Sequence, residues 1–424
     1  MPTPAQTPAS TPAITRYAGM MVTRGSTLVL KFGLSFFLAR YLDLRVLGLY
    51  GLVVGATLVL PTLYRAGLTS TITRATVNAQ PAHIVDDLQH YLLWVAGCYL
   101  ATLLLVLGAQ LLGWDAAWPV HLYLVWLVVF AEHLAADLGL LFSNLYQTQT
   151  ANLLGLVQTA IWVLPFCSLA VLYPAWRSME VLLAFWAGGS WLAVLAFGLL
   201  LKDWPWRQRA PVQRQWFRSH LPASAYLYLS DLSGTLAQFA DRYLIAVLID
   251  IQHAGIYTLY FQLANAVYTL VSSSIINLHR PGVLSAFQKR NEPLATALLR
   301  SLQKRALASM LLMSLAVGLA FHALAPLLHR PLVMQYLPLM WLTFLATGFK
   351  IACLTSFVEL FGRHLDAHLF LLNVLILLLV ALGSVALIPA FGIYGIPLAT
   401  GLTYLLAWFY IHHIVRSHTP RLAQ

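Results

Sequence analysis

Apolar segments of about 20 residues recur along the whole chain, separated by short polar breaks. Each is long enough to cross the roughly 30 Å hydrocarbon core of a bilayer as a helix rising about 1.5 Å per residue. Of the 424 residues, 60% are hydrophobic and 9% are charged, whereas an ordinary soluble domain has about 25% charged residues. A water-soluble fold would have too little polar surface to cover itself, so the membrane is the solvent for most of this protein.

The apolar segments have the pattern of helices. Backbone polar groups must be satisfied inside lipid, so membrane spans are either helices or strands of a closed barrel. Runs such as Leu103–Leu107 and Val374–Leu382 lack the alternation that barrel strands need. We therefore expect an all-α polytopic membrane protein with about 12 transmembrane helices, at residues 19–40, 47–70, 89–113, 119–142, 152–173, 179–201, 222–248, 254–279, 304–327, 335–361, 366–389 and 393–415.

Lys and Arg gather in the links after the sixth and eighth spans, which predicts that these links and both termini are cytoplasmic. Trp204, Trp206 and Trp216 are expected to anchor the first of these links at the membrane surface. The resulting domains are a disordered tail (1–18), an N-lobe of six spans (19–201), a basic cytoplasmic linker (202–221), a C-lobe of six spans (222–415) and a cytoplasmic tail (416–424).

The formal net charge of +11 follows from this loop bias and does not indicate a nucleic-acid partner. The three cysteines lie in apolar runs without the paired spacing of a disulfide or metal framework. His364 and His368 have the spacing of a helical metal pair, but no acid or cysteine pattern completes a site. No Walker A sequence is present, so nothing supports ATP hydrolysis by this chain. We expect neither a cofactor, nor a metal, nor an enzyme.

A short motif occurs twice. Asp43, Gly48 and Tyr50 match Asp250, Gly255 and Tyr257 in the pattern D-x4-G-[LI]-Y, at an offset of 207 residues. Each copy follows the first span of a six-span half, and six is even, so the halves have the same orientation. Parallel repeats of this kind place a substrate site between two lobes. The expected fold is therefore two parallel six-helix lobes.

Around these motifs the sequence resembles the polysaccharide-transporter family, whose best-known members are the flippases for O-antigen and capsule repeat units. Its superfamily also holds multidrug exporters and the flippase for the peptidoglycan precursor. One departure is Asp43, where family members commonly have glycine, so the turn after the first span is expected to differ locally. The segments that carry the resemblance are Ala39–Asp43, Gly48–Tyr50, Gly67–Arg74, Asp241–Ile245 and Gly255–Ala264.

The resemblance implies a flippase that moves a polyprenyl-diphosphate-linked oligosaccharide across the bacterial inner membrane by alternating access. Membrane lipids and other proteins of polysaccharide assembly are the further partners that it implies. Two alternatives stay open, a multidrug or metabolite exporter of the same superfamily and a membrane polysaccharide polymerase. A polymerase usually needs large external loops that carry acids or arginines, and this chain has none.

Charged residues within the spans are candidate site residues because a charge at the bilayer centre costs several kcal/mol. Arg24 and Lys31 are seven residues apart and share one helical face. The resemblance implies that spans one, two and seven line the central cavity, and Lys350 adds positive charge in span ten. Arg and Lys can bind phosphate oxygens through charge-assisted hydrogen bonds. The predicted contacts to the diphosphate are Arg24, Lys31, Arg65 and Arg242.

Acidic residues in the spans admit two interpretations. They can neutralise the bases as salt-bridge partners, or they can bind a coupling ion, either H⁺ or Na⁺. The candidates are Glu132, Asp137, Asp231 and Asp241.

Overall fold

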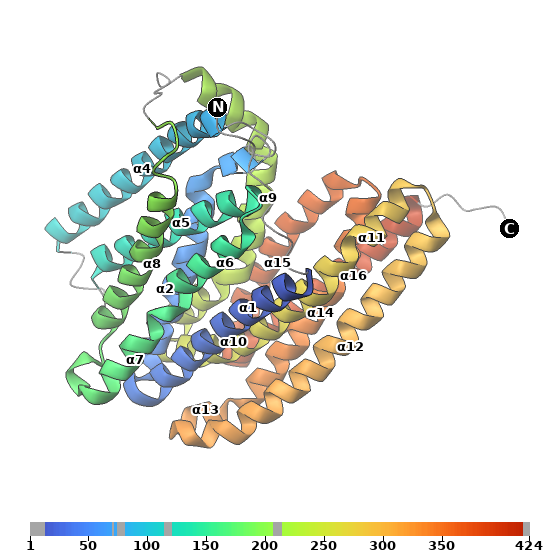
Figure 1. The fold of residues 1–424 in the computed structure, drawn as a ribbon. Coiled ribbons are helices and arrows are strands. Elements are labelled where there is room, and N and C mark those ends of the chain that lie inside the picture. Colours follow the sequence, from blue (N-terminus) through green and yellow to red (C-terminus); the bar gives the residue numbers. More distant parts are fainter. Residues whose placement is uncertain (1–12, 70–71, 74–80, 114–120, 207–213, 419–424) are drawn as a thin grey trace. The chain divides into compact units, whose positions relative to one another are not determined.

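The computed structural model describes residues 13–69, 72–73, 81–113, 121–206 and 214–418, and this part of the chain is helical throughout with no strand (Figure 1). Short π-helical or 3₁₀ turns join several of the helices. The main helices are α1 (Ala13–Phe37), α2 (Leu44–Arg65), α4 (Pro81–Leu111), α5 (Leu122–Asn144), α6 (Thr148–Leu156), α7 (Val163–Leu172), α8 (Met179–Leu200), α9 (Arg214–Leu248), α10 (Ile251–Val271), α11 (Asn277–Gln288), α12 (Glu292–Leu324), α13 (Pro331–Gln335), α14 (Leu337–Gly362), α15 (Asp366–Phe391) and α16 (Gly395–His418).

Each of the twelve expected spans coincides with a helix or a pair of consecutive helices. Among the described residues, nine helical stretches are long and apolar enough to cross a membrane, and one of them, His368–Ser417, contains both α15 and α16. The stretch Thr148–Leu172 corresponds to α6 and α7 together. Helices α1 and α9, which lie at the first and seventh expected spans, fall outside this set, so these two spans stay a prediction. The predicted all-α polytopic membrane fold is therefore confirmed.

The chain forms two compact units. The first comprises the described residues up to Leu34 together with Ala56–Tyr228, and the second comprises Ser35–Gly55 and the described residues from Leu229 onward. The division falls within α1, α2 and α9, so these helices contribute to both units. The lobe boundaries expected from the sequence stay a prediction, and most of the expected N-terminal tail lies outside the described residues.

The core of unit 1 forms where α4, α5 and α8 pack together, with aromatic side chains filling the space between them. Trp216 belongs to this core, while its expected position at the membrane surface stays a prediction. Its ring stacks on His90 with centroids 5.2 Å apart, and its indole N–H donates to Asp87 at 2.9 Å. Helix α9 begins at Arg214, which places Trp216 in its first turn, against α4.

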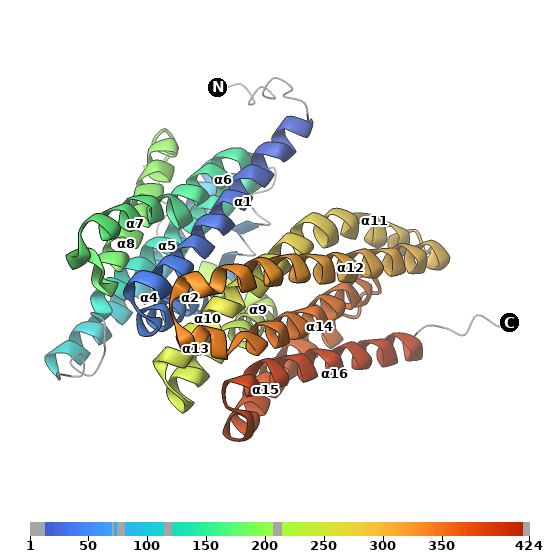
Figure 2. The same ribbon diagram turned by 90° about the horizontal axis from the view of Figure 1, so that it is seen from below.

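Unit 2 is built around α14, which contacts α10, α12 and α16, while α15 packs against α16 (Figure 2). A buried cluster that includes Cys353, Leu360, Ile376 and Ile411 joins α14, α15 and α16. These contacts hold the middle of α14 in a fixed position, and the polar residues of that segment face a cavity described below.

The repeated motif forms a symmetric helix crossing inside unit 2. A Cβ added to Gly48 of α2 would lie 2.1 Å from the carbonyl oxygen of Ile251, and one added to Gly255 of α10 would lie 2.0 Å from that of Leu44. The offset of 207 residues that relates Gly48 to Gly255 also relates Leu44 to Ile251. The two copies therefore pack on each other in equivalent ways, with glycine allowing the backbones to approach closely.

Asp43 and Asp250 occupy the corresponding positions before these two helices. Asp250 is the N-cap residue of α10, and its carboxylate accepts a hydrogen bond from the His253 backbone N–H at 2.7 Å. Asp43 has extended backbone geometry, and its carboxylate accepts from the Leu44 N–H at 2.6 Å. No left-handed conformation is needed at Asp43, which is why a residue other than glycine fits there.

Candidate functional site

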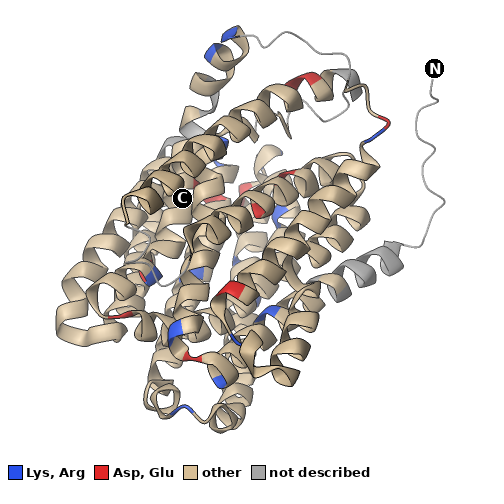
Figure 3. Ribbon diagram, turned by 90° about the vertical axis from the view of Figure 1, so that its left-hand side faces the viewer, with Lys and Arg blue, Asp and Glu red and all other residues tan. Residues whose placement is uncertain are grey.

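Charged residues are scattered along ribbons that consist mainly of uncharged residues (Figure 3). Two groups of them lie within the described helices. One group, in unit 1, contains Arg65 and Asp137, and the other, in unit 2, contains Asp241, Arg242 and Lys350. A charge that is held within a membrane span is a candidate functional site by default.

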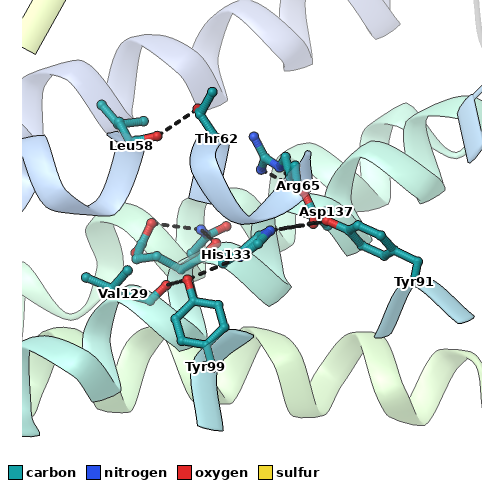
Figure 4. Close-up of polar contacts among 10 residues, drawn as sticks. Leu58, Thr62, Arg65, Tyr91, Tyr99, Val129, His133 and Asp137 are labelled. Carbon is teal, nitrogen blue, oxygen red and sulfur yellow. Dashed lines mark hydrogen bonds and ion pairs between the residues drawn. The ribbon is translucent and has the colours of Figure 1, made fainter. Parts of the chain in front are cut away.

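The group in unit 1 is centred on the carboxylate of Asp137 in α5 (Figure 4). Arg65, the last residue of α2, donates to its Oδ1 from Nε at 2.8 Å and from Nη2 at 2.7 Å. The side chain of Asp137 is 10% exposed and that of Arg65 is 26% exposed. Arg65 is thus held by a carboxylate, yet a quarter of its side chain is accessible.

The second carboxylate oxygen of Asp137 faces His133, one helical turn earlier on α5. Nε2 of His133 lies 2.9 Å from this oxygen, Oδ2, which also accepts the hydroxyl of Tyr91 from α4. On the other side of the imidazole, Nδ1 lies 3.1 Å from the hydroxyl of Tyr99, also on α4. We call Arg65, Tyr91, Tyr99, His133 and Asp137 the unit 1 network. Its histidine is fully buried.

Glu132 lies beside this network but faces other helices. Its carboxylate accepts hydrogen bonds from Gln158 at 2.9 Å, Trp186 at 2.7 Å and Ser190 at 2.8 Å. These three donors are uncharged. The negative charge of Glu132 acts on Lys31, which is exposed on α1 in the same unit. Lys31 thus has an electrostatic partner, and the side chain of Arg24 lies outside the described part of the structure.

The group in unit 2 contains a buried carboxylate, Asp241 on α9. Asp241 is 4% exposed and accepts the hydroxyl of Tyr257 at 2.7 Å and the backbone N–H of Arg242 at 2.8 Å. Asp231, ten residues earlier on the same helix, is exposed. The two acids that the sequence suggests on this span therefore differ in environment, and only Asp241 belongs to a buried polar group.

Arg242 is almost completely buried, with 2% of its surface exposed. Its guanidinium carbon lies 4.0 Å from the ring centroid of Phe261 and 5.1 Å from that of Phe239. Its Nε and Nη1 have no hydrogen-bond partner among the described residues. Contact with aromatic faces stabilises a desolvated cation by about 2 kcal/mol, which offsets only part of the cost of burial.

Lys350, near the middle of α14, faces a cavity of about 40 Å³ together with Asp241. Its ammonium lies 4.6 Å from the ring centroid of Tyr268, and no carboxylate of the described residues lies within 4.0 Å of it. A cavity of this size holds about two or three water molecules. Its polar lining also includes Gln238, Asn265, Thr343, Thr347 and Thr400.

Two cations, the buried Arg242 and the half-buried Lys350, therefore accompany one buried carboxylate in unit 2, which leaves this group with an excess of positive charge. In unit 1, by contrast, Arg65 pairs with Asp137 and Lys31 interacts with Glu132. Sequence reasoning selected Arg65, Asp137, Asp241 and Arg242 but missed His133. The spacing of His133 and Asp137, four residues apart on one span, was the available signal.

Comparisons with solved structures give the same fold. A multidrug resistance MATE family transporter of the MOP superfamily, in an inward-facing conformation, is 12% identical with a TM-score of 0.73, covering 95% of this chain and 99% of that chain. The lipid II flippase MurJ, in an inward closed conformation, is 12% identical with a TM-score of 0.69, covering 95% of this chain and 88% of that chain. At this identity the likeness establishes the two-lobed transporter fold alone.

Sequence comparison supplies the family. No curated protein matches the chain by sequence. Residues 18–277, more than half of the chain, match the family described as polysaccharide biosynthesis protein. This match confirms the resemblance seen at the repeated motifs, and both structures named above are transporters. The chain therefore belongs to the polysaccharide biosynthesis protein family and has the fold of MOP-superfamily transporters.

Proposed function

We propose that this protein is a flippase that moves a polyprenyl-diphosphate-linked oligosaccharide from the cytoplasmic to the outer leaflet of the bacterial inner membrane. Both termini are in the cytoplasm, and the product serves the assembly of a surface polysaccharide. Membership of the polysaccharide biosynthesis family and the fold shared with a lipid II flippase support this substrate class.

The observation that carries the proposal is Lys350, an ammonium near the middle of a span with no carboxylate of the described residues within 4.0 Å. A charge held near the middle of a membrane span costs several kcal/mol. Its charge interacts with that of the buried cation Arg242, and among the described residues of this group Asp241 is the one carboxylate that offsets the two cations. The surplus positive charge suits a ligand that carries negative charge, and a diphosphate is such a ligand.

In the proposed mechanism, Lys350 binds phosphate oxygens when the transporter exposes this cavity to one leaflet. The present cavity of about 40 Å³ is too small for a diphosphate, so binding requires a second state in which the cavity is wider. The polar side chains of the lining, such as Asn265 and Thr347, then supply hydrogen bonds to the head group. The hydrocarbon tail of the substrate stays in the bilayer throughout.

The test uses purified protein in liposomes that contain a polyprenyl diphosphate bearing a fluorescent oligosaccharide. An impermeant quencher added outside measures how fast the head group changes leaflet. We expect Lys350→Met to slow this exchange at least tenfold and Lys350→Arg to retain most of it. Lys304→Met, at an exposed lysine of α12, is the matched control and should leave the rate unchanged.

Stability measurements separate a functional from a structural role for Lys350. Replacement by methionine leaves Arg242 and Asp241 as a balanced buried pair, so the variant should unfold at the same temperature as the wild type or higher. Slow exchange with unchanged stability supports the proposal. Exchange at the wild-type rate in Lys350→Met excludes this residue as the phosphate ligand, and no exchange by the wild type refutes the flippase function.

A further inference from the structure

The unit 1 network contains a buried histidine whose two ring nitrogens both have partners. Tyr99 donates its hydroxyl to the carbonyl oxygen of Val129 at 3.3 Å, so its oxygen is free to accept a hydrogen bond from Nδ1–H of His133 at 3.1 Å. On the other side, Oδ2 of Asp137 already accepts the hydroxyl of Tyr91, and Nε2 of His133 lies 2.9 Å from it. A carboxylate only accepts hydrogen bonds, so Nε2 also carries a hydrogen. The geometry thus fits a doubly protonated, cationic imidazole.

The neutral form of His133 also has a hydrogen-bond partner at each ring nitrogen, provided that one hydroxyl group rotates. When Nδ1 loses its proton, the Tyr99 hydroxyl can turn from the Val129 carbonyl to Nδ1 and donate there instead. Nε2–H still donates to Asp137. A buried polar group without a partner costs about 1–3 kcal/mol, and neither protonation state of His133 leaves one here. The network can therefore gain or release a proton without rearranging its heavy atoms.

We propose that His133 is the proton-binding site through which this transporter couples substrate movement to a proton gradient. The imidazolium shares Asp137 with Arg65 because Arg65 binds Oδ1 while His133 faces Oδ2. Protonation changes the network from neutral to a net charge of +1 and weakens the hold of Asp137 on Arg65. Arg65, which is 26% exposed, then becomes a better ligand for an anion.

The other titratable groups that face His133 do not carry a compensating charge. Tyr91 and Tyr99 from α4 are neutral hydrogen-bonding partners, and Cys98 adjoins Tyr99 on the same helix. Tyr64 of α2 contacts the ring of Tyr99, with its own hydroxyl 2.6 Å from Thr102. Glu132 is directed toward its donors on η3 (Val157–Ile161) and α8. Asp137 and Arg65 are therefore the charges that decide whether His133 holds its proton.

A small cavity borders the network on one side. A cavity of about 20 Å³, enough for about one water molecule, is lined by Asp137 and Tyr91 together with Thr73 and Asn144. Asn144 ends α5, so this cavity lies toward the helix end that the loop charges assign to the cytoplasm. A water molecule in this cavity could exchange a proton with Asp137, which lines it, and Asp137 lies 2.9 Å from Nε2 of His133.

The first experiment needs no substrate. Infrared difference spectra between pH 5.5 and pH 8.5, recorded on purified protein with ring-labelled histidine, report imidazolium that is lost as the pH rises. The wild-type signal minus that of His133→Gln isolates this one residue. We expect a remaining band of one imidazolium that is absent from the variant. Spectra that are identical in the two proteins would overturn the proposal, whatever the substrate proves to be.

The second experiment measures coupling, and it rests on the proposed function. The affinity for farnesyl diphosphate should fall roughly tenfold when a rise in pH removes the proton from His133. This magnitude is the effect of one positive charge about 10 Å from the ligand at an effective dielectric constant of about 20. By linkage, the ligand also favours proton uptake. His133→Gln should give a flat profile. Tyr99→Phe lacks the acceptor for Nδ1–H, so its pH profile of affinity should differ from that of the wild type.

The two experiments distinguish an error in the proton site from an error in the proposed function. If His133 titrates in the spectra but the wild type does not bind farnesyl diphosphate at any pH, the proposed substrate class is wrong and the proton site stands. If diphosphate binds with the same affinity at all pH values while His133 titrates, the coupling through Arg65 is wrong. A Tyr99→Phe pH profile that is identical to the wild-type profile would exclude the hydroxyl switch.

Discussion

A substitution at the crossing of α2 and α10 tests how tightly the repeated motif packs. The Cβ of Gly255→Ala would lie 2.0 Å from the Leu44 carbonyl oxygen, whereas real Cβ contacts essentially never fall below 3.0 Å. The helices must therefore separate by about 1 Å. Overpacking of this kind lowers the free energy of unfolding by about 1–3 kcal/mol. The higher helix propensity of alanine offsets up to about 1 kcal/mol of this loss. We expect a net loss of about 1–2 kcal/mol, and a similar loss for Gly48→Ala.

The double variant distinguishes close packing from a general effect. Once Gly255→Ala has separated the helices, Gly48→Ala meets less resistance, so the double variant should lose at least about 0.5 kcal/mol less than the sum of the single losses. Unfolding in detergent, followed by tryptophan fluorescence over increasing denaturant, measures each value. Gly97→Ala, which would meet no heavy atom within 4 Å, is the control and should be neutral or stabilising. Additive losses, or a Gly255→Ala variant as stable as the control, would refute the crossing.

Two further predictions concern single polar contacts. Asp137→Asn leaves the Arg65 guanidinium without its counter-charge and should destabilise unit 1 by about 3 kcal/mol. The double variant with Arg65→Met should recover most of this loss, because it removes the unpaired cation. Equal unfolding midpoints for the wild type and Asp137→Asn would contradict this prediction. Asp250→Ala removes the N-cap of α10 and should lower stability by about 1 kcal/mol, whereas Asp250→Asn keeps it. Partial burial acts to raise the pKa of Asp250, but hydrogen bonds from the His253 backbone and ring outweigh it, so the pKa lies below its usual value. The stability that the Asp250 cap contributes is therefore present above about pH 4 and is lost as the pH falls through the lowered pKa. The unfolding midpoints of the wild type and Asp250→Ala should converge as the pH falls. Midpoints that stay apart at pH 2 would contradict this prediction.

Much of the fold follows from the sequence because the membrane restricts the possibilities. Runs such as Val374–Leu382 can only be helical spans, and they lie in α15 as expected. The repeat at Gly48 and Gly255 indicated two related halves, but it did not reveal that the two glycines contact the partner helix directly. That contact depends on the angle and rotation of the helices, which no local sequence pattern specifies.

The candidate site was predictable only in part. The cost of intramembrane charge identifies Arg65, Asp137, Asp241 and Arg242 as unusual, yet pairing depends on which helix faces pack together. Arg65 and Asp137 are 72 residues apart in sequence and form an ion pair, whereas Arg242 follows Asp241 directly, and its side chain lies against aromatic rings instead. The surplus cation Lys350 could not be recognised before the structure was available, because several acids in the spans, such as Glu132 and Asp231, offered it a partner.

Removal of the gene for this chain tests the central claim most directly. In a strain that lacks it and has no redundant transporter, surface polysaccharide and the lipid-linked precursor are measured with and without a plasmid-borne wild-type copy. We predict that the surface polymer disappears, that the precursor accumulates with its head group on the cytoplasmic side, and that the wild-type copy reverses both. Normal surface polymer in the deletion strain, or a precursor that accumulates on the outer face, would contradict the assignment as a flippase.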